Sequence, residues 1–267
     1  MLIIDAHVHI YPNFDLDRAI RKSVKNFIHC QHNGGKREDA IKIWMLTERS
    51  DCFFFQRAPD LELPDFSFEQ ADEEDALVVL DNATNEPLLY IVAGRQIISS
   101  DNLEVCALAT TFYQQDKTLN TLETIRAVRS AGGLAAINWA PGKWFGARGK
   151  IVQKMFDAFD PAELFISDTT MRPTCWRTPI KMAAAQRRGF RLVTGSDPLP
   201  FAGEEDLIAS YTFVTEGDFH QHKPVSSLRS ILCAPQRTFA ICGRRSGPLA
   251  FAKRQFKIMT EKKRSSC

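Results

Sequence analysis

The N-terminal segment of the chain carries three ionisable side chains in alternation with apolar ones. It reads LIIDAHVHI, with Asp5, His7 and His9 separated by single apolar residues. Strand side chains alternate between two faces, so we expect these three residues to share one face. Two neutral imidazoles about 6.6 Å apart along a strand can converge on one metal ion or serve two neighbouring ions. We therefore predict His7 and His9 as metal ligands; core histidines hydrogen-bonded to backbone are the alternative.

A second group of polar residues follows a later apolar run, in RLVTGSDPLPFAGEED. A predicted strand ends there at Ser196 and Asp197, before a loop rich in proline and glycine. In barrels of parallel strands, the reactive groups lie at the carboxyl ends of the strands. A carboxylate at this place can ligate a metal and accept a proton from an activated water. Asp197 is thus predicted as a third ligand and as the catalytic residue, with a turn-capping aspartate as the alternative.

Five more residues occupy places where a barrel would carry its site. Asn138 and Asp168 end the apolar runs LAAIN and LFISD, and Asp5 shares the predicted histidine face. Each of these three is a candidate ligand or a group that orients a ligand. Lys143 and Arg172 follow in the adjoining loops and could bind a phosphate or carboxylate of the substrate. The alternative is that both cations are solvated loop residues.

A second His-x-His pattern occurs late in the chain. His220 and His222 stand in FHQHKP, after the last clear strand–helix unit. The flanking residues are polar, so the alternating apolar face of a buried strand is missing here. We expect these two histidines to form a loop pair that does not reach the metal.

The elements that must position these residues alternate between helix and strand. Apolar residues recur every three or four positions over 15–30, which predicts a helix. The three apolar runs 76–81, 88–98 and 103–110 read as strands, of which the first two suit a hairpin. The remaining predicted helices are 119–131, 147–159 and 179–189, and the strands between and after them are 134–140, 162–168 and 190–197. This order is typical of βαβ units and predicts an α/β fold. Within that class we predict a distorted TIM-like barrel of seven or eight βα units. An open doubly wound sheet is the alternative.

Length, charge and cysteine content exclude several classes of protein. The 267 residues are 44% hydrophobic and carry a net charge of only +2, so no global field recruits nucleic acid or a membrane surface. No apolar run is long enough to span a bilayer, and the N-terminus lacks the features of a secretory signal.

The seven cysteines include no Cys-x-x-Cys pair, so we expect reduced thiols and a cytoplasmic protein. Neither GxGxxG nor GxxxxGK[ST] occurs.

Two segments differ in composition from the rest. Residues near 58–76 are acidic, and we expect a solvated surface insertion or, alternatively, an insertion over the mouth of the site. From Gly243 onward the chain holds eight basic residues and one acidic residue. We therefore predict a single barrel domain over 1–243 and a basic C-terminal helix or tail over 244–267. The tail is either a solvated final helix or a site for an anionic partner such as nucleic acid.

The motifs together resemble a known group of enzymes. DAHVH, the strand-rich middle, GGLAAINWAPGK and the strand-terminal GSD resemble the PHP (polymerase and histidinol phosphatase) family over roughly residues 1–215. They also resemble the wider amidohydrolase-like metal-dependent hydrolases, including TatD-type enzymes. The resemblance implies a distorted barrel, a cluster of divalent ions and hydrolysis of a phosphoester. His7 and His9 match the first motif, and Asp197 matches its terminal aspartate.

The chain departs from the PHP pattern at three positions. Asn138 stands where members usually have a histidine, Gln96 occupies the likeliest slot of a glutamate, and Pro198 follows GSD where a histidine is common. A thinned ligand set implies one or two ions (Zn, Mn, Fe or Mg), because imidazoles suit Zn or Fe and carboxylates suit Mn or Mg. The expected function is a metal-dependent phosphoesterase acting on a small phosphorylated substrate. The alternatives are a degenerate site with a scaffold or regulatory role, and an amidohydrolase or TatD-type hydrolase of C–N bonds or nucleic acid ends.

Overall fold

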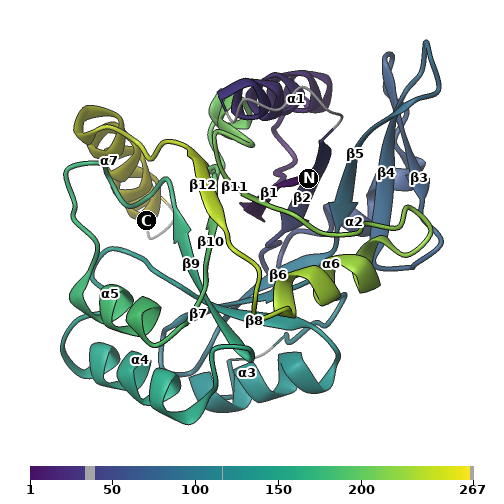
Figure 1. Ribbon diagram of the computed structural model, residues 1–267. Coiled ribbons are helices and arrows are strands. Elements are labelled where there is room, and N and C mark those ends of the chain that lie inside the picture. Colours follow the sequence, from purple (N-terminus) through teal and green to yellow (C-terminus); the bar gives the residue numbers. More distant parts are fainter. Residues whose placement is uncertain (34–39, 116, 265–267) are drawn as a thin grey trace.

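The computed structural model describes residues 1–33, 40–115 and 117–264 (Figure 1). Its strands form two mixed sheets, of seven and five strands, with helices interleaved between them in sequence. The α/β class is therefore confirmed, but neither sheet closes into a barrel, so the predicted TIM-like barrel is wrong.

The larger sheet is built around the N-terminal strand. Its strands, in the order in which they pair, are β12 (Ala240–Gly243), β11 (Tyr211–Thr215), β1 (Leu2–Val8), β2 (Ile41–Leu46), β5 (Pro87–Val92), β4 (Ala76–Asp81) and β3 (Phe66–Gln70). β1 pairs in parallel with β2 and antiparallel with β11. β4 and β5 pair antiparallel, as expected for the hairpin predicted over these runs.

The smaller sheet carries the βα units of the second half of the chain. Its strands, again in pairing order, are β10 (Leu192–Gly195), β9 (Leu164–Thr169), β8 (Leu134–Asn138), β7 (Glu104–Leu108) and β6 (Gly94–Ile98). β8, β9 and β10 are parallel, whereas β6 and β7 are antiparallel to their neighbours. A barrel of βα units needs parallel strands throughout. The hairpins β3–β4–β5 and β6–β7 interrupt that pattern and leave two open sheets.

The two sheets approach each other closely where β10 lies against β1. A side chain on Gly195 would place its Cβ about 2.4 Å from the backbone nitrogen of His7. Only glycine permits this approach, because every other residue would clash with the backbone of β1. The backbone N–H of Asp197, just past β10, donates to the carbonyl of His7 at 2.8 Å. The glycine of GSD thus brings the aspartate of the same motif to the first histidine.

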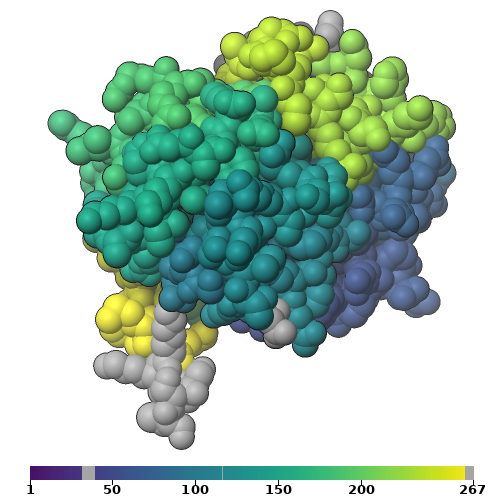
Figure 2. All heavy atoms as spheres, turned by 90° about the horizontal axis from the view of Figure 1, so that it is seen from below, coloured from purple at the N-terminus to yellow at the C-terminus, as the bar shows by residue number. Residues whose placement is uncertain are grey.

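Helices cover both sheets. The long helix α1 covers the larger sheet (Figure 1). Helices α3, α4 and α5 cover the smaller sheet on the face that Figure 2 shows. The C-terminal helix, in yellow, lies at the edge of that face. The helix bounds are α1 (Leu16–Asn33), α2 (Phe54–Arg57), α3 (Thr121–Ser130), α4 (Gly146–Ala158), α5 (Ile180–Arg187), α6 (Pro224–Cys233) and α7 (Pro248–Arg264). The helices predicted over 15–30, 119–131, 147–159 and 179–189 correspond to α1, α3, α4 and α5. A capping box between Asn120 and Glu123 sets the start of α3.

The acidic segment near 58–76 contributes a strand to the larger sheet. Phe66 and Phe68 of β3 are buried against that sheet's core, so a solvated loop is wrong for these residues. Glu73, farther along, accepts hydrogen bonds from the backbone N–H groups of Val225 and Ser226 at the start of α6. The segment therefore has a structural role at the edge strand and at a helix end.

Two further features concern the cysteines and the helices. A disulfide joins Cys30 of α1 to Cys242 of β12, so the expectation of reduced thiols is wrong for these two cysteines. Cys52, Cys106, Cys175 and Cys233 are free thiols. Over the described ranges, none of the helices combines the length and the apolar composition that crossing a bilayer requires.

Candidate metal centre

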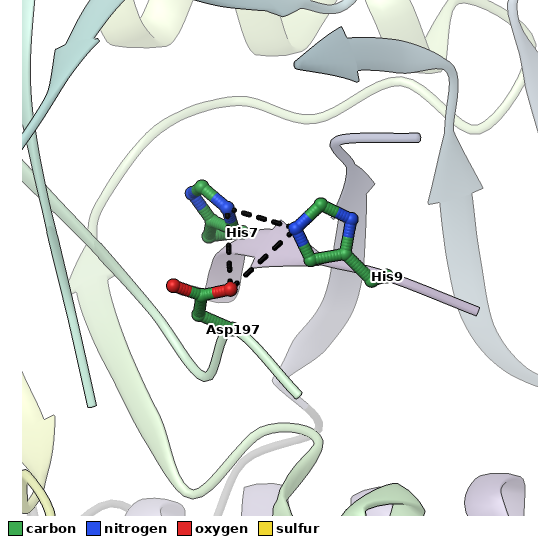
Figure 3. Close-up of side chains that lie close together, drawn as sticks. All are labelled: His7, His9 and Asp197. Atoms are coloured by element: carbon green, nitrogen blue, oxygen red, sulfur yellow. Dashed lines mark hydrogen bonds and ion pairs between the residues drawn. The ribbon is translucent and has the colours of Figure 1, made fainter. Parts of the chain in front are cut away.

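His7, His9 and Asp197 meet where the two sheets adjoin (Figure 3). The Nε2 atoms of the two histidines lie 3.1 Å apart. Asp197 Oδ1 lies 3.6 Å from the His7 nitrogen and 3.5 Å from the His9 nitrogen. Both histidines are buried, and the Asp197 side chain is 14% exposed. The fold therefore brings together the three predicted ligands, although Asp197 lies 190 positions after His7 in the sequence.

An irregularity in β1 turns His7 toward the second sheet. Leu2, Ile4 and Ala6 contribute to the core between the sheets, whereas Ile3 and Val8 contribute to the core under α1. The register of β1 against β2 shifts between Asp5 and Val8, so the alternation changes phase there. His7 consequently faces the second sheet, with Nδ1 3.4 Å from Ser167 Oγ and 3.6 Å from Cys106 Sγ. The expectation that Asp5 shares one face with both histidines is wrong.

The protonation states of the cluster suit ligation of a cation. Burial lowers the pKa of His7 to about 4, although the Asp197 carboxylate opposes that shift. Burial disfavours ionisation of Asp197, yet His7 and His9 hold the pKa of this carboxyl well below its usual range. At neutral pH the cluster therefore offers a neutral imidazole and a carboxylate. These are the protonation states in which the two groups bind metals.

Asp197 adopts an unusual backbone conformation, with φ at +50°. Residues with a side chain visit this left-handed region at a cost of about 1–2 kcal/mol. Thr169 Oγ1 donates to Asp197 Oδ2 at 3.0 Å, which leaves Oδ1 directed at the imidazoles. Local strain of this kind persists where surrounding contacts hold it, and it is frequent at functional sites.

Asp5 holds backbone rather than facing the cluster. Its Oδ1 accepts from the N–H groups of His7 (3.1 Å) and Ser196 (2.9 Å), and its Oδ2 accepts from that of Ala209 (2.8 Å). Burial raises the pKa of Asp5 to about 6, and these hydrogen bonds oppose the rise. Asp5 thus ties β1 to the segment that carries Asp197.

Asp168 and Arg172 form a buried pair away from the cluster. Arg172 Nε donates to Asp168 Oδ1 at 2.7 Å, and Tyr211 donates its hydroxyl to Asp168 Oδ2 at 3.0 Å. Arg172 Nη1 also donates to the carbonyl of Trp176 at 3.0 Å. Neither Asp168 nor Arg172 is among the residues that line the cavity at the cluster. Their contacts support a role in fixing the loop after β9.

The cluster opens into a cavity of about 550 Å³. Residues from both sheets, from the loops after β8 and β10 and from α7 line it: His9, Tyr11, Arg49, Gln96, Glu104, Asn138, Trp139, Ala140, Pro141, Met171, Asp197, Leu199, Pro200, Phe201, Ile258 and Glu261. None of them comes from 58–76, so the acidic segment is not an insertion over this mouth. A larger apolar cavity of about 680 Å³ lies apart, around Phe145 and Trp176.

Glu104 is the carboxylate that sequence reasoning missed. Asn138 Nδ2 donates to Glu104 Oε2 at 2.9 Å, and Lys143 Nζ makes a short hydrogen bond to Oε1. Glu104 opens β7, and β7 is antiparallel to β8, so the start of one strand lies beside the end of the other. Site residues gather at the carboxyl ends of strands only where the strands are parallel, so the start of β7 does not follow that rule. A charged residue at the start of an apolar run was the available signal.

Asn138, a candidate ligand from the sequence, lines the cavity. Its Oδ1 is buried and has no hydrogen-bond partner among the described residues, and the same is true of Nδ1 of His9. Buried polar atoms are seldom left unpaired in native proteins. Two such atoms at one cavity support a polar ligand there.

The second His-x-His pair lies elsewhere on the surface. His222 is 89% exposed and its Nδ1 lies 2.7 Å from an Asp72 carboxylate oxygen. His220 donates its backbone N–H to Ser227 Oγ. Within the described ranges, the three-ligand cluster of potential metal-binding side chains contains neither of them.

Comparison with known proteins supports the fold and shows no family. No protein-family model and no curated protein matches this chain. PsfC from Pseudomonas syringae PB-5123 is similar in structure, with a TM-score of 0.52 and 13% identity over 99% of this chain and 98% of PsfC. A two-domain protein from Bacteroides vulgatus ATCC 8482, containing a predicted PHP-like metal-dependent phosphoesterase, has a TM-score of 0.47 and 11% identity over 89% of this chain and 64% of its own. The first likeness shows the fold alone, and the second is too weak to carry an argument.

Proposed function

We propose that this protein is a metal-dependent hydrolase of phosphoesters in which His7, His9 and Asp197 hold a divalent ion. The observation that carries the proposal is the convergence of two Nε2 atoms and one carboxylate oxygen at a cavity. The choice of phosphoesters rests on the resemblance of DAHVH and GSD to the PHP family.

The geometry of the three residues fits an ion. Tetrahedral ligands about 2.0–2.2 Å from a zinc ion are about 3.3–3.6 Å from one another. The observed separations are 3.1, 3.5 and 3.6 Å. Two neutral Nε2 atoms facing each other repel unless a proton or cation lies between them. With the His7 proton on Nδ1, toward Ser167 Oγ, the Nε2 lone pair is free for the ion.

The cavity provides the other groups that hydrolysis needs. When bound, a divalent ion is a Lewis acid that lowers the pKa of water toward about 7. Asp197, held ionised by its neighbours, suits permanent ligation better than proton transfer. We therefore assign acceptance of the proton from the attacking water to Glu104, which lines the same cavity.

Two cations can bind the substrate's anionic group. Arg49 lines the cavity, and Lys143 contacts Glu104 at its edge. A guanidinium matches two phosphate oxygens, and an ammonium acts as a point charge. The predicted substrate-binding role of Lys143 is kept in this proposal.

The test combines metal analysis with turnover. We expect purified full-length protein to bind Zn²⁺ or Mn²⁺ near one equivalent in calorimetry and to hydrolyse p-nitrophenyl phosphate or its bis ester. His7→Ala, His9→Ala and Asp197→Asn should lose both properties. His222→Ala is the matched control, because His222 is exposed and lies outside the three-ligand cluster.

Two results would redirect the proposal. Hydrolysis of an anilide or a lactone without hydrolysis of either phosphoester would favour the amidohydrolase alternative. Absence of metal binding, with the stability of the His7 and His9 variants unchanged, would contradict a metal enzyme and favour a scaffold.

A further inference from the structure

Among the side chains of the C-terminal helix α7 that the structure describes, up to Glu261, one charged side chain is buried: that of Arg254, which is 5% exposed. Nη1 donates to Thr170 Oγ1 at 2.7 Å and to Ser246 Oγ at 3.3 Å. Nη2 donates to the backbone carbonyl of Asp197 at 2.6 Å and pairs with Glu204 Oε2 at 2.7 Å. A buried guanidinium is stable only when it is paired and hydrogen-bonded, so these contacts fix α7 at this place. The basic tail is therefore not simply a solvated helix.

The contact with Asp197 matters because of the backbone of that residue. Asp197 has φ at +50°, a region that favours glycine. Its N–H donates to the carbonyl of His7, and its carbonyl accepts from Arg254. The peptide groups on both sides are thus held, one by β1 and one by α7. This conformation directs Oδ1 toward the two imidazoles.

The same arginine also fixes the loop that follows Asp197. Glu204 Oε2, its ion-pair partner, accepts from the N–H of Leu199 at 3.1 Å. Lys257 follows Arg254 by three positions, nearly one helical turn, and its Nζ lies 5.2 Å from the centre of the Phe201 ring. Leu199 and Phe201 line the cavity, as does Ile258 of α7 itself. The helix and the loop therefore form one wall of the site.

We propose that Arg254 is a positioning residue of the metal site: it holds Asp197 in the left-handed conformation in which its carboxylate meets His7 and His9. The inference rests on the proposed function only in treating Asp197 as a ligand. Without the guanidinium, the carbonyl of Asp197 loses its donor, the backbone relaxes, and Oδ1 leaves the imidazoles. The basic tail then acts on the site rather than on an anionic partner.

The first test uses the metal-free full-length protein and does not depend on catalysis. Imidazole ¹⁵N resonances of His7 and His9 are assigned by loss in the two alanine variants and compared between wild type and Arg254→Ala. We expect both resonances to shift, because the carboxylate beside the rings moves. Arg244→Ala is the matched control on the same segment, since Arg244 is exposed, and its spectrum should match wild type. Unchanged His7 and His9 resonances in folded Arg254→Ala would overturn the inference.

The second test measures affinity for the metal. Changes outside the ligands typically cost 10–100-fold in metal affinity. We expect a loss of about that size for Zn²⁺ in Arg254→Ala and a smaller loss in Arg254→Lys, because lysine cannot form the forked contacts. Methylguanidinium, at concentrations far below those that unfold the protein, should restore part of the affinity of Arg254→Ala and leave Arg244→Ala unchanged.

The outcomes separate this inference from the proposed function. If Arg254→Ala does not fold, Arg254→Lys and Glu204→Gln carry the same comparisons, since each keeps part of the cluster. Wild-type affinity in all folded variants would overturn the positioning role while leaving the metal site intact. A wild-type protein that binds no metal would contradict the proposed function, and the resonance comparison would still decide the role of Arg254.

Discussion

Two His-x-His pairs occur in this chain, and the structure treats them differently. His7 and His9 are buried and turn their Nε2 atoms toward each other and toward Asp197. His220 and His222 follow β11 in a polar segment, and His222 pairs at the surface with Asp72.

The difference shows that spacing alone does not make a ligand pair. The first pair lies in and just after a central strand whose neighbours exclude water, and a glycine of the second sheet lets a carboxylate approach. The second pair has solvent as its alternative partner, so its histidines need no ion. Burial of a polar pair without enough hydrogen-bond partners is therefore the stronger signal of a site.

The largest expected effect separates the two pairs directly. His7→Ala should lower Zn²⁺ affinity by more than the roughly 10–100-fold typical of changes outside the ligands, because it removes one of three ligands. His222→Ala should leave the affinity unchanged. Titration calorimetry measures both, and equal losses in the two variants would erase the distinction.

The next largest effect is expected at Glu104, which lines the cavity beside the first histidine pair. Glu104→Gln should reduce turnover of the phosphoester by about 10²–10⁴-fold, the usual contribution of a general base, while metal stoichiometry stays at the wild-type value. Exposed Glu69→Gln is the control for the same chemical change. Loss of the metal together with turnover would make Glu104 a ligand instead of the proton acceptor.

A third prediction concerns the residue that orients the first pair without joining it. Asp5→Ala leaves three buried N–H groups without their acceptor, and each such group costs about 1–3 kcal/mol. We expect a loss of about 3 kcal/mol in the free energy of unfolding by urea. Asp157→Ala, at an exposed ion pair, should change it by less than about 0.5 kcal/mol. Comparable values for the two variants would refute the backbone role of Asp5.

The smallest effect is expected near the second pair, at the start of α6. Partial burial opposes ionisation of Glu73, but hydrogen bonds from Ser226 and Val225 lower its pKa from the ordinary 4.5. A lowered carboxyl pKa stabilises the fold above that ordinary value, and the contribution disappears as pH falls through the folded pKa.

Glu73→Gln should therefore lower stability by at most about 1 kcal/mol at neutral pH, and the difference from wild type should shrink below about pH 4.5. Thermal unfolding across pH measures this, with the exposed neighbour Glu74→Gln as control. A difference that grows on acidification would have the wrong sign for this account.

Much of the secondary structure and the three central site residues were predictable. The spacing of apolar residues predicted four helices. The alternation in LIIDAHVHI and the strand-terminal GSD identified His7, His9 and Asp197. These signals are local, because each depends on a few consecutive residues within one element.

The remaining features depend on contacts that no local pattern encodes. Barrel closure failed because the direction of β6 and β7 is set by pairing partners, and the same antiparallel pairing brings Glu104 to the site. Strict alternation would place Asp5 and His7 on one face of β1, but the phase change between Asp5 and Val8 separates them. Arg254 lies 57 positions after Asp197 and reaches it because α7 packs against the site. The composition of the tail indicated only that it is basic.

The most direct test of the metal site is anomalous X-ray scattering from crystals grown with Zn²⁺ or Mn²⁺. We predict an anomalous peak about 2.0–2.2 Å from Nε2 of His7, Nε2 of His9 and Oδ1 of Asp197. A peak at His220 and His222 instead, or no peak at the three predicted ligands at saturating metal, would contradict the central claim.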